Sequence, residues 1–256
     1  AGESSQIIDH PDVKRMLVTM KSTIEALRRL IYWNAACIDI AAHHPDAAER
    51  ETASDMAALL TPLSKGWGTD MGVELTGTAI QVHGGMGFIE ETGVAQHYRD
   101  ARITTIYEGT NGIQGMDLVG RKLGMKGGTV VLGLLDDIDA LVAGLPSDDT
   151  FAGIRRELGA ASAVARRCST WLMQNSKNPV AALSGATPYL RVMGMTVGGY
   201  LMAASAKKAA SSGAHEKVAT ARFFCEQLLP QVTGLESAVT GDSALLMSFD
   251  AETLAV

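Results

Sequence analysis

Helical periodicity runs along almost the whole of this 256-residue chain. From Val13 onward, apolar residues recur at steps of three and four, at Met16, Leu17, Met20, Ile24, Leu27, Leu30 and Ile31. This spacing places the apolar side chains on one face of an α-helix, whereas a half-buried strand needs strict alternation. No alternating pattern of useful length is present. The sequence therefore predicts an all-α fold.

Glycine and proline divide the helical pattern in the first half of the chain. Pro11 fits the first turn of a helix, and His43-His44-Pro45 ends that helix. A second helix is predicted over residues 47–66. Gly66 and Gly68 then interrupt the pattern, because glycine is a poor helix former, and a third helix follows.

A glycine-rich stretch over residues 124–129 separates two helical regions and is interpreted as a hinge. Beyond it, helices are predicted over residues 129–144, 149–176, 188–211 and 214–239. We therefore predict two domains. The first is a helical bundle over residues 1–125, and the second is an appended helical domain over residues 129–256.

Charge and cysteine content exclude several classes of protein. A formal net charge of −6 and a pI near 5.5 argue against a general nucleic-acid surface. Cys37, Cys168 and Cys225 lie far apart, so neither a CxxC motif nor a disulfide framework is indicated. A reducing, cytoplasmic compartment fits this composition best.

The sequence contains no sign of a membrane segment, a signal peptide or a metal site. No apolar run reaches the ~18 residues that a membrane span needs. Residues 1–5 do not resemble a signal peptide and do not begin with Met, which favours a fragment or a cloning junction. His83 and His97 are not spaced like metal ligands with each other or with His43-His44.

The most specific information lies in three blocks, at residues 78–88, 98–103 and 106–114. The third block reads Ile106-Tyr107-Glu108-Gly109-Thr110-Asn111-Gly112-Ile113-Gln114. The order and spacing of the blocks resemble the last, helical domain of the flavin-dependent acyl-CoA dehydrogenases. Residues 7–17 resemble the second helix of that domain. The region after about residue 128 resembles the appended helical domain of a long-form subgroup that includes the 3-methylmercaptopropionyl-CoA dehydrogenases.

Glu108 is the candidate catalytic residue. Removing a proton from the carbon next to a thioester needs a carboxylate close to that carbon and shielded from water. Gly109 lets the backbone approach a ligand, and the following helix start offers amide groups to a developing enolate oxygen. Taken alone, a loop glutamate is more simply a solvated surface charge. The resemblance implies that Glu108 is the base and that a hydride leaves the substrate β-carbon for FAD.

The resemblance also implies cofactor contacts at Gln81, Gly84 and Gly85. This stretch corresponds to one that contacts the FAD of a neighbouring subunit in related enzymes. Glycines at a helix end expose amide groups that suit a phosphate, and Gln81 offers both a donor and an acceptor. Without the resemblance, the same glycines are simply a helix cap.

Further contacts are implied around the predicted base. Thr110 corresponds to a second flavin contact and is also a candidate N-cap. The family pattern often has Gln or Glu two places after this threonine, whereas Gly112 stands here, so that side-chain contact is lost. Tyr107, Glu108 and Gly109 are the predicted substrate-binding residues.

Family members also contain a middle β domain that cradles the flavin ring, and 256 residues of helical pattern leave no place for it. We therefore expect the chain alone to bind FAD poorly and to turn over nothing. The resemblance implies an acyl-CoA substrate, an electron-transfer flavoprotein as acceptor, and a homo-oligomer that is a dimer or a tetramer. No nucleic-acid or membrane partner is expected. The alternatives are an acyl-CoA oxidase fragment and a non-catalytic helical oligomerisation module.

Two groups of residues receive structural interpretations. Arg99 and Asp100 are predicted to form a buried ion pair. Trp33, Trp67 and Trp171 are predicted to lie in the core or at an interface, because aromatic rings of this size dominate such contacts.

Overall fold

The computed structural model describes residues 6–255, and within that range it contains helices and turns but no strand. The predicted all-α fold is confirmed. Residues 1–5 of the first predicted domain and residue 256 of the second lie outside the described residues. No helix in the described range is long and apolar enough to cross a membrane.

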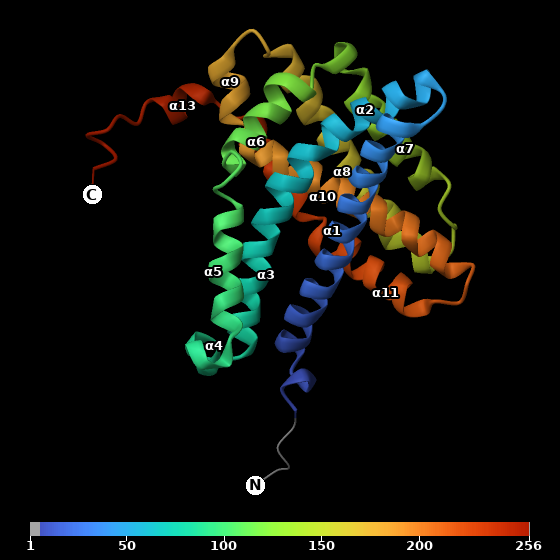
Figure 1. The fold of residues 1–256 in the computed structure, drawn as a ribbon, viewed down its shortest axis with the longest axis vertical. Helices are drawn as coiled ribbons and strands as arrows, with labels where there is room; N and C mark the ends of the chain where they lie inside the picture. Colours follow the sequence, from blue (N-terminus) through green and yellow to red (C-terminus); the bar gives the residue numbers. More distant parts are fainter. Residues whose placement is uncertain (1–5, 256) are drawn as a thin grey trace.

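The first region consists of three long helices and several short ones (Figure 1). Its elements are η1 (Ile7–Asp9), α1 (Pro11–His43), α2 (Ala47–Pro62), η2 (Leu63–Trp67), α3 (Gly68–Val82), α4 (Gly85–Phe88), η3 (Glu90–Thr92), α5 (Val94–Thr104), α6 (Asn111–Asp117) and η4 (Leu118–Lys122). The first half of α1 and the paired helices α3 and α5 extend away from the rest of the molecule, with α4 at the tip.

The second region is also helical. Its elements are η5 (Met125–Gly128), α7 (Thr129–Ala143), α8 (Asp149–Gln174), α9 (Pro179–Ser184), α10 (Ala186–Ala210), α11 (His215–Phe223), η6 (Phe224–Leu228), α12 (Gln231–Thr240) and α13 (Ser243–Met247). Three of the four helices predicted here are present as α7, α8 and α10. The fourth, predicted over residues 214–239, is divided into α11, η6 and α12 by a turn at Leu229 and Pro230, and α9 and α13 lie outside the predicted ranges. The predicted hinge is a tight turn, in which Gly127 and Gly128 have φ angles of 71° and 89°.

Helix α10 is the centre of the molecule. It contacts α1 and α6 of the first region and α8, α11 and α12 of the second, and nearly every residue over 189–199 is buried. A single hydrophobic core extends from Ala26 on α1 to Val239 on α12. The two predicted domains therefore share one core, and the boundary between them stays a prediction.

The interruption predicted at Gly66 and Gly68 is wrong, because the chain stays helical there. Residues 63–67 form a π-helical turn, η2, which joins α2 directly to α3. Trp67, 1% exposed, ends this turn and lies against α10 at Gly194 and Gly198. A Cβ atom at Gly194 would overlap the indole ring. The small residue on α10 thus makes room for the largest side chain in the core.

The other two tryptophans also agree with their predicted place. Trp33 and Trp171 are partly buried and pack against the core, and the ring of Trp33 lies 6.1 Å from that of Tyr200 on α10. All three cysteines are free and buried. Burial raises the pKa of Cys168 to about 11 and also raises that of Cys37.

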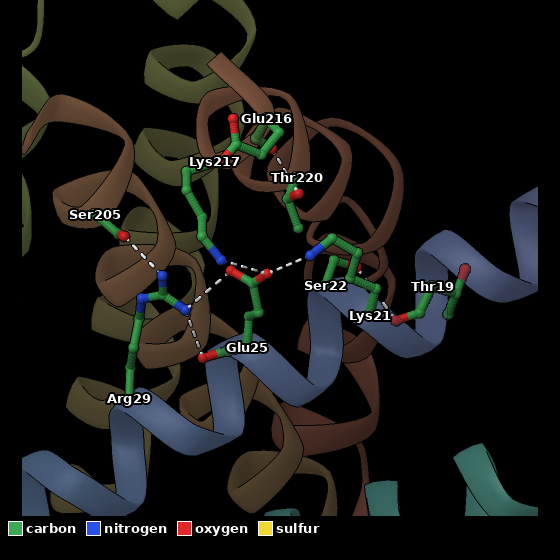
Figure 2. A network of polar contacts seen from close by, with 9 residues as sticks. All are labelled: Thr19, Lys21, Ser22, Glu25, Arg29, Ser205, Glu216, Lys217 and Thr220. Carbon is green, nitrogen blue, oxygen red and sulfur yellow. Dashed lines mark hydrogen bonds and ion pairs between the residues drawn. The ribbon is translucent and has the colours of Figure 1, made fainter. Parts of the chain in front are cut away.

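A polar network around Glu25 connects α1 to the second region (Figure 2). The Glu25 carboxylate accepts hydrogen bonds from Lys21 at 2.7 Å and from Lys217 on α11 at 3.0 Å. Arg29 lies 3.3 Å from the same carboxylate and also donates to Ser205 on α10 at 2.8 Å. Burial alone would raise the pKa of Glu25, but the bonds and charges of the two lysines outweigh it and lower this pKa from 4.5 to about 2.

The packing of Trp67 on α10 predicts opposite effects for two glycine-to-alanine substitutions. Gly194→Ala should lower the free energy of unfolding by about 1–3 kcal/mol, because the new methyl group displaces the indole ring. Gly72→Ala is the matched control, since no atom lies within 4 Å of its new methyl group. It should raise stability by about 0.5–1 kcal/mol through helix propensity alone. Urea denaturation measures both, and equal effects would contradict this packing.

The Glu25 network predicts a pH dependence of stability. The folded-state pKa of Glu25 is lower than its unfolded value, so its contribution is fully present above pH 4.5 and is lost as the pH falls toward 2. Glu25→Gln should lower the free energy of unfolding by about 1–3 kcal/mol at pH 7. It should also make stability depend less on pH below 4.5, because the titrating carboxyl group is gone. Glu51→Gln removes a more exposed partner of Lys126 and should cost less than about 1 kcal/mol. Denaturation curves between pH 7 and pH 3 would refute the prediction if the two variants behaved alike.

Candidate functional site

The predicted base lies on the loop between α5 and α6. This loop follows Thr104 and turns sharply, because Glu108 and Gly109 both have positive φ angles, of 53° and 80°. A left-handed glutamate is uncommon, since its Cβ crowds the backbone, so the surrounding contacts must hold it there. The side chain of Glu108 is exposed in this chain. The shielding from water expected for a base is therefore not supplied by the described residues.

Hydrogen bonds from Asn111 close the loop at its C-terminal end. The amide of Asn111 donates to the carbonyl of Thr105 at 3.1 Å. The buried side-chain amide of Asn111 donates to the carbonyl of Gly66 at 3.0 Å and to the carboxylate of Asp70 at 2.6 Å. Asn111 is thus directed toward η2 and α3 rather than toward a ligand.

Thr110 begins α6 as predicted. Its Oγ1 accepts a hydrogen bond from the amide of Ile113 at 3.4 Å, which is the N-cap interaction expected of this residue. The threonine is otherwise exposed, so a ligand can still reach it. The flavin contact implied for Thr110 stays a prediction.

Three of the four residues predicted to bind cofactor lie at the opposite end of α5 from the base, and only Thr110 lies beside it. Gln81 is in the last turn of α3, and Gly84 follows that helix with a φ of 61°. Both are exposed, as is Gly85, and no atom lies within 4 Å of a Cβ built at either glycine. Gln81 borders a hollow between α1 and α3 that Arg15 also lines. The structure therefore leaves room for a phosphate to approach the backbone here.

The length of α5 separates the two groups of predicted site residues. This helix has eleven residues, and each adds about 1.5 Å, so its ends are about 16 Å apart. Tyr107, which is exposed beside Glu108, belongs to the base end together with Gly109 and Thr110. Gln81, Gly84 and Gly85 belong to the other end. The structure brings together the residues within each group and does not join the two groups.

The predicted buried ion pair between Arg99 and Asp100 is wrong. Arg99 instead forms an exposed ion pair with Glu90 at 2.7 Å, and Asp100 accepts a hydrogen bond from Gln96. Adjacent residues on a helix point about 100° apart and cannot face each other, whereas residues three or four apart can. The described residues also contain no group of three or more His, Cys, Asp or Glu able to hold a metal ion.

Lys65 contacts the loop that carries Glu108, and this contact was not predicted from the sequence. Its ammonium group donates to the carbonyl of Gly109 at 2.7 Å and to Oδ1 of Asn111 at 2.8 Å. Lys65 lies in η2, more than forty residues before the loop. A single lysine in a helical pattern does not indicate such a distant contact. The π-helical turn that determines the direction of its side chain was not predicted either.

Two family models match the chain, and together they cover most of it. Residues 2–123 match the model described as acyl-CoA dehydrogenase, C-terminal domain. Residues 134–250 match the model described as acetyl-CoA dehydrogenase C-terminal like. The all-α architecture agrees with this class. The chain belongs to the acyl-CoA dehydrogenase C-terminal domain family.

Curated relatives support the same family. The chain is 39% identical to the 3-methylmercaptopropionyl-CoA dehydrogenase of Ruegeria pomeroyi, in a match that covers 97% of this chain and 44% of that protein. It is 33% identical to a butyryl-CoA dehydrogenase of Syntrophomonas wolfei, over 93% of this chain and 41% of the relative. The chain therefore spans less than half the length of these relatives.

Solved structures share the fold at low sequence identity. An acyl-CoA dehydrogenase from Bacillus anthracis, solved in complex with FAD, matches 97% of this chain and 46% of its own with a TM-score of 0.73 at 17% identity. The Caenorhabditis elegans protein ACDH-11, solved in complex with C11-CoA, matches 93% of this chain and 41% of its own with a TM-score of 0.72 at 18% identity.

The loop conformation predicts different outcomes for its two nearby glycines. Gly109→Ala should lower the free energy of unfolding by about 1–2 kcal/mol, because its φ of 80° strains any residue with a Cβ. Gly112→Ala, in the first turn of α6, meets only the Thr110 hydroxyl at 3.8 Å and should be neutral or stabilising. Thermal unfolding of both variants tests this, and a tolerated Gly109→Ala would show that the loop is not held in this conformation.

Proposed function

We propose that this chain is the part of a flavin-dependent acyl-CoA dehydrogenase that supplies the catalytic base, Glu108. The observation that carries the proposal is a glutamate held in a left-handed conformation on a closed, anchored loop, in a chain that belongs to this family. Strained backbone is retained where surrounding contacts enforce it, and it clusters at functional sites.

The chemistry assigned to Glu108 is removal of a proton from the carbon next to a thioester carbonyl. The carboxylate takes the α-proton, and the electron pair left on the α-carbon forms the new carbon–carbon double bond as hydride leaves the β-carbon. The acceptor for that hydride would be supplied by FAD when it is bound. The backbone at the exposed residues Glu108 and Gly109 is suited to hold the thioester oxygen, on which negative charge develops. Tyr107 provides an apolar face beside the acyl chain.

The cofactor is assigned to both ends of α5. Thr110, beside the base, is placed near the flavin of its own site. The open backbone at Gly84 and Gly85, with the side chain of Gln81, fits a phosphate-bearing part of FAD. We assign the second group to the FAD of a neighbouring subunit, as the resemblance to related enzymes implies, and the separation of about 16 Å agrees with two distinct contacts. The proposal thus includes a homo-oligomer, and an electron-transfer flavoprotein as acceptor.

A specific observation favours a second candidate function, the non-catalytic oligomerisation module. Ile24, Ile31 and Ile38 recur at seven-residue steps on α1, and all three are exposed in this chain. Residues seven apart lie on one face of a helix, and exposed apolar side chains there can pack against another helix. This function needs no glutamate at position 108, so the variant below separates the two candidates.

Glu108→Gln in the full-length enzyme should lower kcat by about three or more powers of ten, because the amide cannot accept the α-proton. Its flavin content and its affinity for the CoA ester should stay near those of the parent. Glu49→Gln, which removes an exposed carboxylate on α2, is the matched control and should leave turnover unchanged. Dye reduction measures kcat, and flavin absorbance measures the cofactor. Equal turnover by the Glu108→Gln variant and the parent would remove Glu108 from this role.

A further inference from the structure

The contact between Lys65 and the Glu108 loop joins residues that are distant in the sequence. The Lys65 ammonium donates one hydrogen bond to the carbonyl of Gly109 and another to Oδ1 of Asn111. These two residues are the next and the third residue after Glu108. The lysine thus spans the turn in which the positive φ angles of Glu108 and Gly109 occur. Charge-assisted hydrogen bonds of this kind are stronger than neutral ones.

The lysine is itself held in place by η2. The carbonyl of Lys65 accepts a hydrogen bond from Thr69 at 2.7 Å, and that of the next residue, Gly66, accepts one from the Asn111 side chain at 3.0 Å. Trp67, at the end of the same turn, is fixed against α10. A π-helical turn contains one more residue per hydrogen-bonded ring than an α-helix and rotates the side chains that follow. Lys65 and Gly66 therefore both meet the loop.

Lys65 lies close to two carboxylates. Its pKa is lowered below the ordinary value, because the effect of burial outweighs that of the Asp70 and Glu108 carboxylates, which raise it. Glu108 is exposed and Lys65 is half-buried, and the hydrogen bonds of the lysine go to the Gly109 carbonyl and the Asn111 side chain rather than to the Glu108 carboxylate. The lysine does not need to touch a substrate to affect the base.

We propose that Lys65 is the positioning residue for Glu108, because it holds the Gly109 carbonyl and thereby fixes the left-handed turn that presents the carboxylate. The inference deepens the proposed function and rests on it for its catalytic consequence. Its structural part stands separately, since the conformation of the loop can be measured without turnover. Lys65 acts only through the loop and is not placed among the reacting groups.

Hydrogen exchange of the Asn111 amide tests the structural part in the 256-residue chain. This amide donates to the carbonyl of Thr105 and so reports closure of the loop. In Lys65→Met this amide should exchange at least about fivefold faster. The loop then loses the hydrogen bonds of Lys65 to Gly109 and Asn111 and keeps only those of the Asn111 side chain. Lys65→Arg keeps a charged donor and should recover most of the protection. Lys177→Met, a change on an exposed lysine far along the chain, should leave this exchange as in the parent.

Kinetics of the full-length enzyme test the catalytic part. Lys65→Met should lower kcat by about ten- to a hundredfold with little change in KM, flavin content or melting temperature, since only the presentation of the base is affected. Lys65→Arg should restore part of the lost kcat, so that at least a third of the loss in log kcat is recovered. Lys65→Gln is the second variant, used in both measurements if Lys65→Met fails to fold.

The outcomes separate this inference from the proposed function. Parent-like exchange of the Asn111 amide in the folded Lys65 variant would overturn the positioning role, whatever the activity. A uniform loss of protection across the core, with a lowered melting temperature, would also overturn it in favour of general destabilisation. An active Glu108→Gln enzyme would instead refute the proposed function, while faster exchange in Lys65→Met would still stand.

Discussion

Trp67 lies against the backbone of α10, where Gly194 and Gly198 leave space for its ring. The remaining features of the site follow from this contact. A buried indole of this size anchors the end of α2 and the beginning of α3 at one point on α10. The chain passes from α2 to α3 through the π-helical turn η2, which places Trp67 on α10 without a break in the helix. That turn determines which way Lys65 and the carbonyl of Gly66 point, and both meet the loop that carries Glu108.

The same contact shows that the second region supports the structure of the first. Helix α10 belongs to residues that match a separate family model, yet it supports η2 through Trp67 and packs against α6 at Gly115, where a Cβ would lie 3.1 Å from the carbonyl of Ala186. The network around Glu25 adds a charged connection to α10 and α11. A boundary in sequence similarity thus passes through a continuous core, and the second region contributes to the shape of the loop in the first.

The helical periodicity predicted the all-α class and most helices, because apolar spacing is a local property of the chain. The N-cap at Thr110 was predictable for the same reason: its hydroxyl reaches an amide only three residues away. The π-helical turn was not, since glycines at positions 66 and 68 look like breaks until Trp67 finds its place on a helix more than a hundred residues later. The contact of Lys65 with Gly109 depends on that placement. Pairing Arg99 with its neighbour Asp100 failed for another reason, since adjacent helical residues diverge.

The exposure of Glu108 has a direct consequence for how a base here must work. An exposed carboxylate is solvated, and a solvated carboxylate is a weak base toward carbon-bound protons, so the loop alone cannot perform the proposed chemistry. What this chain contributes is geometry: a turn closed by Asn111, with an exposed carboxylate on Glu108. Water must then be excluded by surfaces that cover the loop from outside, where Ile106, Tyr107 and Ile113 are also exposed. Apolar side chains around a charged group are costly to leave in water, and covering them would exclude water from the carboxylate at the same time.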